Sequence, residues 1–435
     1  MRRPLALVPQ FFGSLVFDRR TSRYLPFDAE ATAVLRALVR DGISRVHALA
    51  PPDRREALEG FHAYFEQKGF FTLDGRLAAD ILDATPPLDH LLGPLAVHVE
   101  VIGACNLTCT HCFASPLPRN HDALTLAELD RLFGELASLG SFRLGLTGGE
   151  PLMRPDFFEV VDAALAHGLH PCLTTNALLI TDEIARELGR RPLVWLNVSL
   201  DGATAESNDA VRGAGVFDRV VEKLCILRRH ARFTLAFTIT RDNAEEVDAC
   251  ARLAKELGAH TAVFRPLYPV GAARAKPEMM PGFAQYSDAL VRLGSSVESG
   301  GSVKAVDPFS PQARQASQAK VFANLGCGAG NTVASVSVKG DVNPCSFLGS
   351  LFEAGNVRTR PFAEIWNQSA GFVRMRSLSR ERVNGKFEGG CRARSLAAHG
   401  DIDAPDPWYR EWSDRADSPE PGFNREVDAG HVRTR

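Results

Sequence analysis

Apolar runs of strand length alternate with amphipathic stretches through the middle of the chain. The strand-like runs cover residues 95–102, 142–146, 169–175, 193–200, 233–240 and 260–265. Most stretches between them have helical periodicity, so β–α units follow one another along the sequence. Successive units of this kind form a parallel sheet. We therefore predict an α/β fold whose central domain, residues 91–270, is a partial (β/α)6 barrel of the TIM type. Its functional groups should lie at the carboxyl ends of the strands.

A different pattern precedes the barrel. Short apolar runs lie at residues 5–8, 13–17 and 24–27. They predict strands, and the turn-forming residues before the last run predict a hairpin. Asp28 is placed to cap a helix that ends at Gly42, and residues 53–68 predict a second helix. Strands followed by helices predict a small winged-helix-like module over residues 1–90, with the proline-containing stretch 75–94 as a linker.

Length and charge narrow the class of protein. The chain has 435 residues, enough for more than one domain. Its 50 basic and 52 acidic residues leave a formal charge of −2, which gives no field for holding nucleic acid or an anionic membrane. No apolar run approaches the ~20 residues that span a bilayer, and the N-terminus predicts no secretion signal. We expect a cytoplasmic protein without nucleic-acid or membrane partners, in which residues 271–404 form a further domain and residues 405–435 a charged tail.

The nine cysteines argue against a disulfide framework, since their number is odd and no export signal is predicted. Cys172, Cys225 and Cys250 stand alone in predicted strands or helices, where buried, inert thiols are expected. The other six form two groups, namely Cys105, Cys109 and Cys112, and Cys327, Cys345 and Cys391.

The first group lies in the segment Cys105-Asn-Leu-Thr-Cys109-Thr-His111-Cys112-Phe113, directly after the first barrel strand. Three thiolates on one loop can hold three corners of an iron–sulfur cluster, because iron in such clusters favours soft sulfur ligands. Structural zinc, with His111 as fourth ligand, is the alternative, although zinc sites usually have shorter paired spacings. The spacing of three residues and then two resembles that of the radical S-adenosylmethionine (SAM) superfamily.

The resemblance implies a cofactor and a reaction. In that family the cluster's fourth iron has no protein ligand and is chelated by the amine and carboxylate of SAM. An electron, here from a flavodoxin- or ferredoxin-type donor, cleaves the sulfonium, and the 5′-deoxyadenosyl radical abstracts a hydrogen from the substrate. The cofactor supplies this chemistry, while the protein keeps one coordination site open. By the same resemblance, His111 and Phe113 flank the cluster near the adenine.

Further segments match the family along the barrel. Thr147-Gly148-Gly149-Glu150-Pro151, at the end of the second strand, is similar to the motif that holds the methionyl amine through a charge-assisted contact. The glycines permit close backbone approach. The resemblance adds further cofactor-binding residues at later strand ends, namely Asn176, then Ser199 and Asp201 towards the ribose and the methionyl carboxylate, Arg212 towards that carboxylate, and Ile239 under the adenine. The alternative for Ser199, Asp201 and Arg212 is turn capping or a surface pair, and for Ile239 it is core packing, in place of contact with the cofactor.

The C-terminal cysteines follow an ordered pattern. Cys327 is followed by twelve residues, Gly340, four residues and Cys345, and Gly390-Cys391 comes later. This resembles the SPASM extension, or its shorter twitch form, which binds auxiliary iron–sulfur clusters. Segments Gly355-Asn356-Val357 and Glu364-Ile365-Trp366 are also typical of it. A full extension has cysteines for two clusters, whereas only three are present here, so one cluster is expected. Its fourth iron is expected to be open or to have an oxygen ligand such as Glu388 or Asp401. The alternative is that the three thiols only pack in the core and hold no cluster.

The N-terminal module resembles the PqqD-like recognition element of peptide maturases, which binds a leader peptide as an added strand. Phe17 to Tyr24 and the helix that ends at Gly42 carry this match. We therefore expect a maturase that modifies a ribosomally made precursor peptide. One alternative is a radical SAM enzyme acting on a small molecule, either a haem-type tetrapyrrole or a sugar or other natural-product intermediate. Another is a metal-binding regulator, and a purely structural role for the module also stays open.

Overall fold

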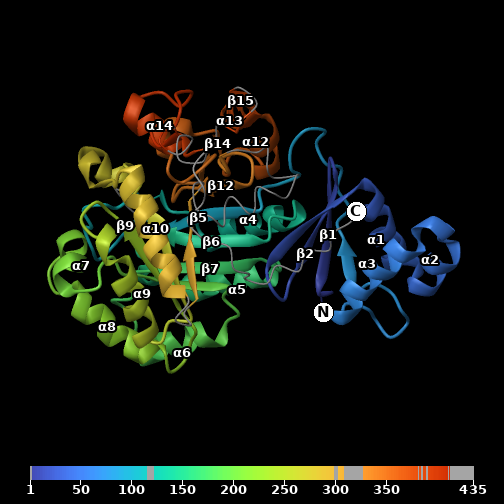
Figure 1. Cartoon of the computed structure of the whole chain (residues 1–435), viewed down its shortest axis with the longest axis horizontal. Coiled ribbons are helices and arrows are strands. Elements are labelled where there is room, and N and C mark those ends of the chain that lie inside the picture. The colour runs from blue at the N-terminus through green and yellow to red at the C-terminus, as the bar shows by residue number, and fades with distance from the viewer. Residues whose placement is uncertain are drawn as a thin grey trace.

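A computed structural model describes residues 2–114, 122–297, 302–307, 327–380, 382–383, 386–387, 390–409 and 411. The barrel lies at the centre, with the N-terminal module beside it and the C-terminal domain over one edge (Figure 1). Among the described residues, no helix is long and apolar enough to cross a membrane.

The N-terminal module is a four-stranded sheet covered by helices. Its strands, in the order β3-β2-β1-β4, are β1 (Leu5–Gln10), β2 (Gly13–Asp18), β3 (Arg23–Asp28) and β4 (Ala79–Ile81), and its helices are α1 (Ala29–Asp41), α2 (Ile43–Leu49), η1 (Pro52–Arg54) and α3 (Arg55–Gln67). As predicted, Asp28 caps α1 by accepting a 2.8 Å hydrogen bond from the Ala31 amide. The predicted linker 75–94 is wrong in part, because β4 pairs in parallel with β1 and both Leu77 and Leu91 are buried.

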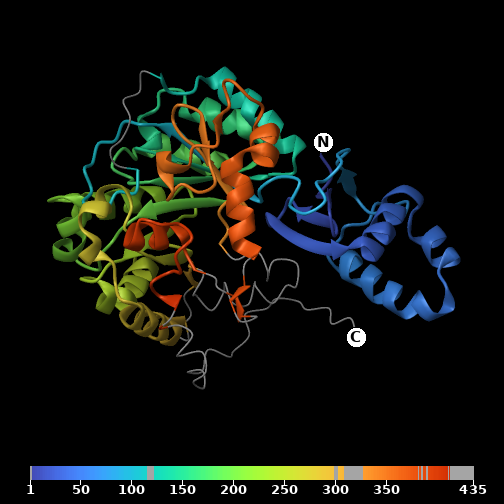
Figure 2. The same cartoon turned by 90° about the horizontal axis from the view of Figure 1, so that it is seen from above.

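Both faces of this sheet are covered. Leu5, Leu7 and Val16 pack against the module's own helices, whereas Ala6, Val8, Leu15 and Phe17 belong to the barrel's core. At the contact, the Phe17 and Phe142 rings lie 4.8 Å apart. The Tyr24 hydroxyl donates to the Gly140 carbonyl and accepts from the Phe142 amide, each at 2.7 Å. The module is therefore packed firmly on one side of the barrel (Figure 2).

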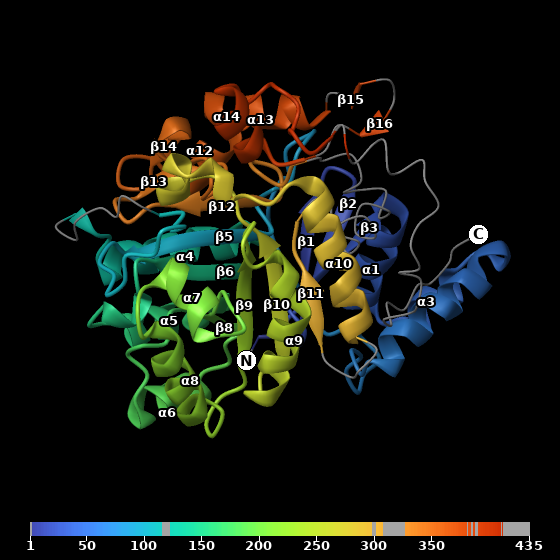
Figure 3. The ribbon, with the colours of Figure 1, turned by 60° about the vertical axis from the view of Figure 1, so that its left-hand side comes forward.

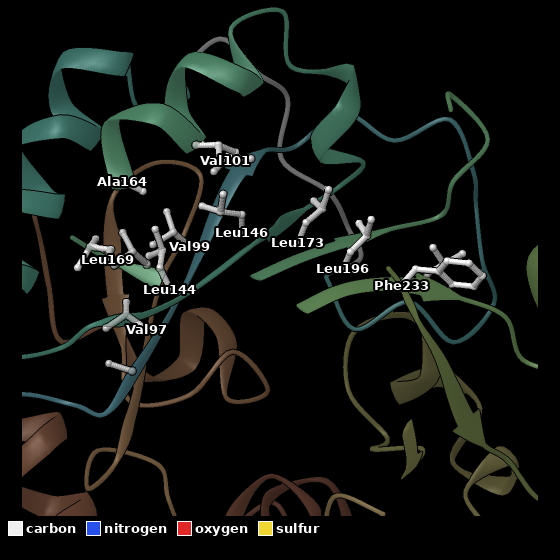
Figure 4. Close-up of a cluster of buried hydrophobic side chains, with 14 of the residues drawn as sticks. Val97, Val99, Val101, Leu144, Leu146, Ala164, Leu169, Leu173, Leu196 and Phe233 are labelled. Carbon is white, nitrogen blue, oxygen red and sulfur yellow. The ribbon is translucent and has the colours of Figure 1, made fainter. Parts of the chain in front are cut away.

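The six predicted barrel strands are all present and parallel. They are β5 (Ala96–Ile102), β6 (Arg143–Gly148), β7 (His170–Thr175), β8 (Trp195–Ser199), β9 (Thr234–Ile239) and β10 (Thr261–Pro266). The helices around them are α4 (Leu126–Ser138), α5 (Phe157–Ala166), α6 (Asp182–Arg190), α7 (Ala205–Arg212), α8 (Val216–Leu227), α9 (Val247–Glu256) and α10 (Phe283–Val297), with short turns η3 (Pro151–Met153), η4 (Ala244–Glu246), η5 (Gly271–Ala275) and η6 (Pro277–Met279). Figure 4 shows part of the core between strands and helices, where Val97 lies beside Leu144, and Leu173 follows farther along the sheet beside Leu146.

The C-terminal domain continues the barrel's sheet. Its elements are β11 (Val303–Ala305), β12 (Val333–Val336), β13 (Asp341–Asn343), η7 (Gly349–Phe352), β14 (Gly355–Asn356), α12 (Phe362–Gln368), α13 (Ala370–Arg380), β15 (Arg382–Val383), β16 (Lys386–Phe387) and α14 (Arg392–His399). Strand β12 pairs in parallel with β5, so the sheet extends past β5 to β14, while β11 adds to β10 (Figure 3). The tail expected from residue 405 is wrong at its start, because Asp406 and Trp408 are buried; residues 412–435 lie outside the described part.

Candidate active site

A cavity of about 320 Å³ opens at the carboxyl ends of the barrel strands. It gathers predicted residues from separate segments, namely Cys105, Cys109, His111, Cys112, Phe113, Gly148, Gly149, Glu150, Asn176, Ser199 and Arg212. Two predicted contacts are absent, since neither Asp201 nor Ile239 lines the cavity; both are buried behind it. Parallel strands end at one edge of a sheet, which brings these distant segments together.

Gly148 and Gly149 are required by the neighbouring backbone. A Cβ atom on Gly149 would lie 2.0 Å from the Ala104 carbonyl oxygen, and one on Gly148 would lie 2.2 Å from that of Ile102. In their place, backbone hydrogen bonds run from the Gly149 amide to Ile102 (2.7 Å) and from the Glu150 amide to Ala104 (2.8 Å). The turn after β6 is thereby fastened to the residues that begin the cysteine loop.

The Glu150 carboxylate is buried and held by three donors. Its Oε1 accepts hydrogen bonds from the Leu152 amide (3.1 Å) and the Thr175 hydroxyl (2.7 Å), and its Oε2 accepts one from the Asn176 amide (2.7 Å). Burial raises the pKa of Glu150 in spite of these bonds. A carboxylate has about four acceptor positions, so capacity for one further donor remains on the cavity side.

Asp201 supports Arg212 and His111 of the cavity wall from behind. Its Oδ2 lies 2.6 Å from the Arg212 Nη2 and 2.9 Å from the His111 Nε2, and its Oδ1 accepts a 2.7 Å hydrogen bond from the Thr238 amide. Burial would raise the pKa of Asp201, but Arg212 and His111 hold it well below its usual range. The expected direct contact of Asp201 with a cofactor is therefore replaced by the positioning of Arg212 and His111.

The cysteine loop presents three thiols to the cavity. Asn176 Nδ2 lies 3.9 Å from the Cys105 sulfur and donates a 2.7 Å hydrogen bond to Asn106. Burial raises the pKa of Cys109 to about 11. Such thiols stay protonated at neutral pH until a metal displaces the proton, because the thiolate is the ligand.

The donor set fits an iron–sulfur cluster with a polar ligand beside it. Three cysteine sulfurs are the soft ligands that such clusters use. The Nδ1 of His111 and the Nε of Arg212 are buried without a hydrogen-bond partner among the described residues, which leaves polar groups for a ligand. The three sulfurs do not converge on a single metal ion, since no group of three or more His, Cys, Asp or Glu side chains in that part of the chain is arranged to hold one; a cluster instead distributes its cysteine ligands over several irons.

The C-terminal cysteines meet in a second cluster of side chains. Buried Cys391 packs with half-buried Cys327 and Cys345, and their mutual charge repulsion adds to burial in raising the pKa of Cys391. Burial raises the pKa of Cys345 to about 12, and this residue also lines the main cavity. Of the two expected oxygen ligands, Asp401 is exposed and accepts a hydrogen bond from the Asp403 amide, and Glu388 lies outside the described residues.

Sequence reasoning missed a buried network beside this cluster. Arg394 is fully buried between Asp307 (3.0 Å) and Asp406 (2.9 Å), and the Tyr268 hydroxyl donates to Asp307 at 2.7 Å. Asp406 Oδ2 also accepts a 2.5 Å hydrogen bond from the Cys391 amide. The sequence pattern does not indicate this network, because its members come from distant segments and Asp406 falls within the predicted tail.

The three isolated cysteines differ from one another. Cys250 is buried, as expected. The expectation is wrong for Cys225, which is exposed on α8, because that position falls on the solvent face of the helix. Cys172 is only partly buried and lines the main cavity, since its position on β7 points into the barrel.

Comparisons with known protein families match the two sites. A sequence model of the radical SAM superfamily matches residues 99–261, and one of the SPASM iron–sulfur cluster-binding domain matches residues 327–393. The mycofactocin maturase MftC of Mycobacterium ulcerans is 35% identical over 328 residues, which cover 72% of this chain and 87% of that protein. The AdoMet-dependent heme synthase of Methanosarcina barkeri is 34% identical, covering 72% and 96%.

Solved structures share the fold. SuiB of Streptococcus suis, in a crystal structure bound to the precursor peptide SuiA, superposes with a TM-score of 0.73 at 15% identity. The match covers 94% of this chain and 99% of SuiB. The anSMEcpe structure with bound AdoMet gives a TM-score of 0.60 at 18% identity, covering 74% of this chain and 95% of that one.

Proposed function

The chain belongs to the radical SAM superfamily and carries its SPASM domain, and from this premise we propose that it modifies a ribosomally made precursor peptide. As a member of the superfamily it is an enzyme that uses a 4Fe-4S cluster and SAM, and its SPASM domain binds iron–sulfur in addition. The cluster and SAM supply the radical chemistry when they are bound. The protein's own residues bind, orient and enclose them.

We assign the SAM-binding cluster to Cys105, Cys109 and Cys112. A single observation supports this assignment most strongly: backbone hydrogen bonds join the Gly148–Glu150 turn to Ile102 and Ala104, directly before the cysteine loop, and both the turn and the loop line one cavity. Ser199 and Arg212 line the same cavity, and we assign them to the polar end of the cofactor. We assign Glu150 to an ammonium group, because its free acceptor position and negative charge match that donor.

We assign one auxiliary cluster to Cys327, Cys345 and Cys391. These residues pack together although they lie far apart in sequence. Of the two expected oxygen ligands, Asp401 is exposed and Glu388 lies outside the described residues, so the fourth ligand of this cluster stays a prediction.

Two observations favour a peptide as substrate. Mycofactocin maturases, which match at 34–35% identity, and a PqqA peptide cyclase, at 30%, are among the similar proteins. The N-terminal module also presents β3 as an edge strand of its sheet, where a leader peptide can add by backbone hydrogen bonds. The PqqD-like role of this module belongs to the proposal, as do a cytoplasmic location and an electron donor of the flavodoxin or ferredoxin type.

A haem-type tetrapyrrole is the second candidate substrate. It is favoured by the AdoMet-dependent heme synthase of Methanosarcina barkeri, of which the matched segment covers 96%. Incubation of the enzyme with a precursor peptide encoded beside its gene, followed by mass spectrometry, separates the two. A mass change in the peptide supports the first candidate, and a mass change in a haem-type tetrapyrrole alone supports the second.

Anaerobic reconstitution with iron and sulfide tests the cluster assignment. With a strong reductant and SAM, the wild-type protein should form 5′-deoxyadenosine, and the triple variant Cys105→Ala, Cys109→Ala, Cys112→Ala should form none. That variant should keep about four irons per chain in the C-terminal site. Cys225→Ala, which removes an exposed cysteine, serves as the matched control and should behave as wild type. Formation of 5′-deoxyadenosine by the triple variant at the wild-type rate would contradict the assignment.

A further inference from the structure

Arg265 places a guanidinium group in the active-site cavity without a partner. It is half-buried near the carboxyl end of β10 and lines the cavity. No hydrogen bond or ion pair joins its side chain to another residue in the described part of the chain. Burial lowers the pKa of Arg265 and outweighs the attraction of Tyr268 and Asp201. A cation kept in such a place without an anion is costly unless a ligand supplies one.

The other charged groups of the cavity wall are already balanced. Arg212 and His111 share the carboxylate of Asp201. Glu150 is held by its three hydrogen-bond donors. Burial, with a smaller contribution from Arg265, lowers the pKa of His98 to about 4, so this side chain is neutral near pH 7. Among the described lining residues, Arg265 is therefore the cation that lacks a counter-charge.

Arg265 also stands apart from Arg212, which lines the same cavity. Arg212 comes from the end of α7 and pairs with Asp201 at 2.6 Å. Arg265 comes from β10, where it lies in register with Thr238 of β9, and no ion pair holds it among the described residues. The two guanidinium groups therefore come from different elements, and only that of Arg265 is without a carboxylate partner in the described part of the chain.

We propose that Arg265 binds a carboxylate group of the substrate and so fixes which part of the substrate lies next to the SAM site. The inference rests on the proposed function and adds a chemical requirement to it. A guanidinium group matches a carboxylate through two parallel hydrogen bonds. The carboxylate can be the C-terminus of a peptide or a propionate-type side chain, as in glutamate or a tetrapyrrole.

The cavity that Arg265 lines, with a volume of about 320 Å³, leaves room for such a group. The lining also includes Gly145 and Ala236, whose side chains are small. A Cβ atom at Gly145 would lie 2.7 Å from the His98 ring, so the imidazole occupies the space above this glycine. The His98 Nδ1 lies 3.3 Å from the Ser346 hydroxyl, which keeps the ring at the cavity wall. A neutral imidazole can add one hydrogen bond to a carboxylate.

Paired probes test the proposal with the reconstituted full-length enzyme in the presence of SAM. N-acetylglycine and its amide mimic the C-terminus of a chain, and propionate and propionamide mimic a side chain. The binding of each probe is measured by ligand-detected NMR. Wild type should bind one of the acids at least about tenfold more tightly than its amide, the difference expected for a charge-assisted hydrogen bond. The pair with the larger preference identifies the source of the carboxylate.

Variants of Arg265 complete the test. Arg265→Gln should bind acid and amide equally within about twofold, and Arg265→Lys, which keeps the charge, should retain part of the preference. Arg228→Gln removes the same charge from the exposed end of α8 and is the matched control. If Arg265→Gln fails to fold, the Arg265→Lys variant tests the proposal instead. Loss of most of its preference for the acid supports the proposal, because Lys cannot form the paired hydrogen bonds.

Three results would overturn the proposal. The first is the absence of any preference of the wild type for either acid, and the second is an unchanged preference in Arg265→Gln. A tenfold weaker binding of SAM by Arg265→Gln would place this residue in the cofactor site instead. Formation of 5′-deoxyadenosine by the wild type distinguishes failure of the carboxylate inference from failure of the proposed function. If 5′-deoxyadenosine forms but no acid is preferred, only the carboxylate inference fails. If it does not form, the proposed function fails as well.

Discussion

At the scale of single residues, Asp201 has the greatest influence on the site without lining it. Its carboxylate is fully buried and pairs with both Arg212 and His111. Each of these two residues also has a buried nitrogen that no described residue satisfies. Asp201 therefore fixes the orientation of two groups that remain available to a ligand.

Replacement of Asp201 by Asn should damage both folding and cofactor binding. It leaves Arg212 buried without a counter-charge, which typically costs about 3–5 kcal/mol of the free energy of unfolding. Denaturant unfolding should show this loss, and the dissociation constant for SAM should rise at least about tenfold because Arg212 is no longer held. Asp182→Asn, which breaks exposed pairs, should cost no more than about 1 kcal/mol. Unchanged SAM binding by the Asp201 variant would contradict this role.

Most residues that line the cavity could be predicted from the sequence, because they lie at the ends of predicted strands. It misplaced Asp201, since a strand-end carboxylate can face the cavity or lie behind it, and only the packing of α7 and β9 decides which. It also passed over Arg265, although a single charged residue in the run Thr-Ala-Val-Phe-Arg-Pro at a strand end was a usable signal.

At the scale of elements, the turn after β6 holds the cysteine loop in place. The amides of Gly149 and Glu150 donate to the carbonyls of Ile102 and Ala104, immediately before Cys105. The strands themselves were predictable from local periodicity. The parallel pairing of β12 with β5 was not, because partner choice depends on contacts between residues more than two hundred positions apart.

Replacement of Gly149 by Ala should displace the cysteine loop. The new Cβ would lie 2.0 Å from the Ala104 carbonyl oxygen, so the backbone must move. We expect a loss of about 1–3 kcal/mol in the free energy of unfolding, as for overpacked sites, and reduced iron content at the first cluster. Gly282→Ala is the matched control, since no atom lies within 4 Å of the position its Cβ would take. Full iron content in the Gly149 variant would show that the turn does not position the loop.

At the scale of the whole molecule, the N-terminal module and the barrel share one core. Phe17 packs against Phe142 and against the His170 ring at 4.8 Å, and the Ser22 hydroxyl lies 2.5 Å from the His170 Nδ1. Arg143 donates to the Ser22 carbonyl at 2.6 Å. Sequence patterns could outline the module but not this contact, because the apolar face that meets the barrel resembles any other half-buried sheet face.

Docking of the module should weaken in acid. Burial, and then Arg19 and Arg143, lower the pKa of His170 to about 4, whereas a free histidine titrates near 6.5. The docked state thus binds fewer protons, so docking is strongest above about pH 6.5 and is lost progressively as the pH falls towards 4. Hydrogen exchange of residues 13–28, corrected for intrinsic rates, should rise between pH 7.5 and 5.5. His170→Gln should abolish this dependence, and His167→Gln, at a more exposed ion pair, should keep it.

The central claim is that Cys105, Cys109 and Cys112 hold a cluster with one iron open to SAM. Electron paramagnetic resonance of the reduced variant Cys327→Ala, Cys345→Ala, Cys391→Ala tests it most directly, because only the first cluster can then contribute. We predict a signal of a reduced four-iron cluster whose g-values change when SAM is added. A signal that is the same with and without SAM, or no iron–sulfur signal at all, would contradict the claim.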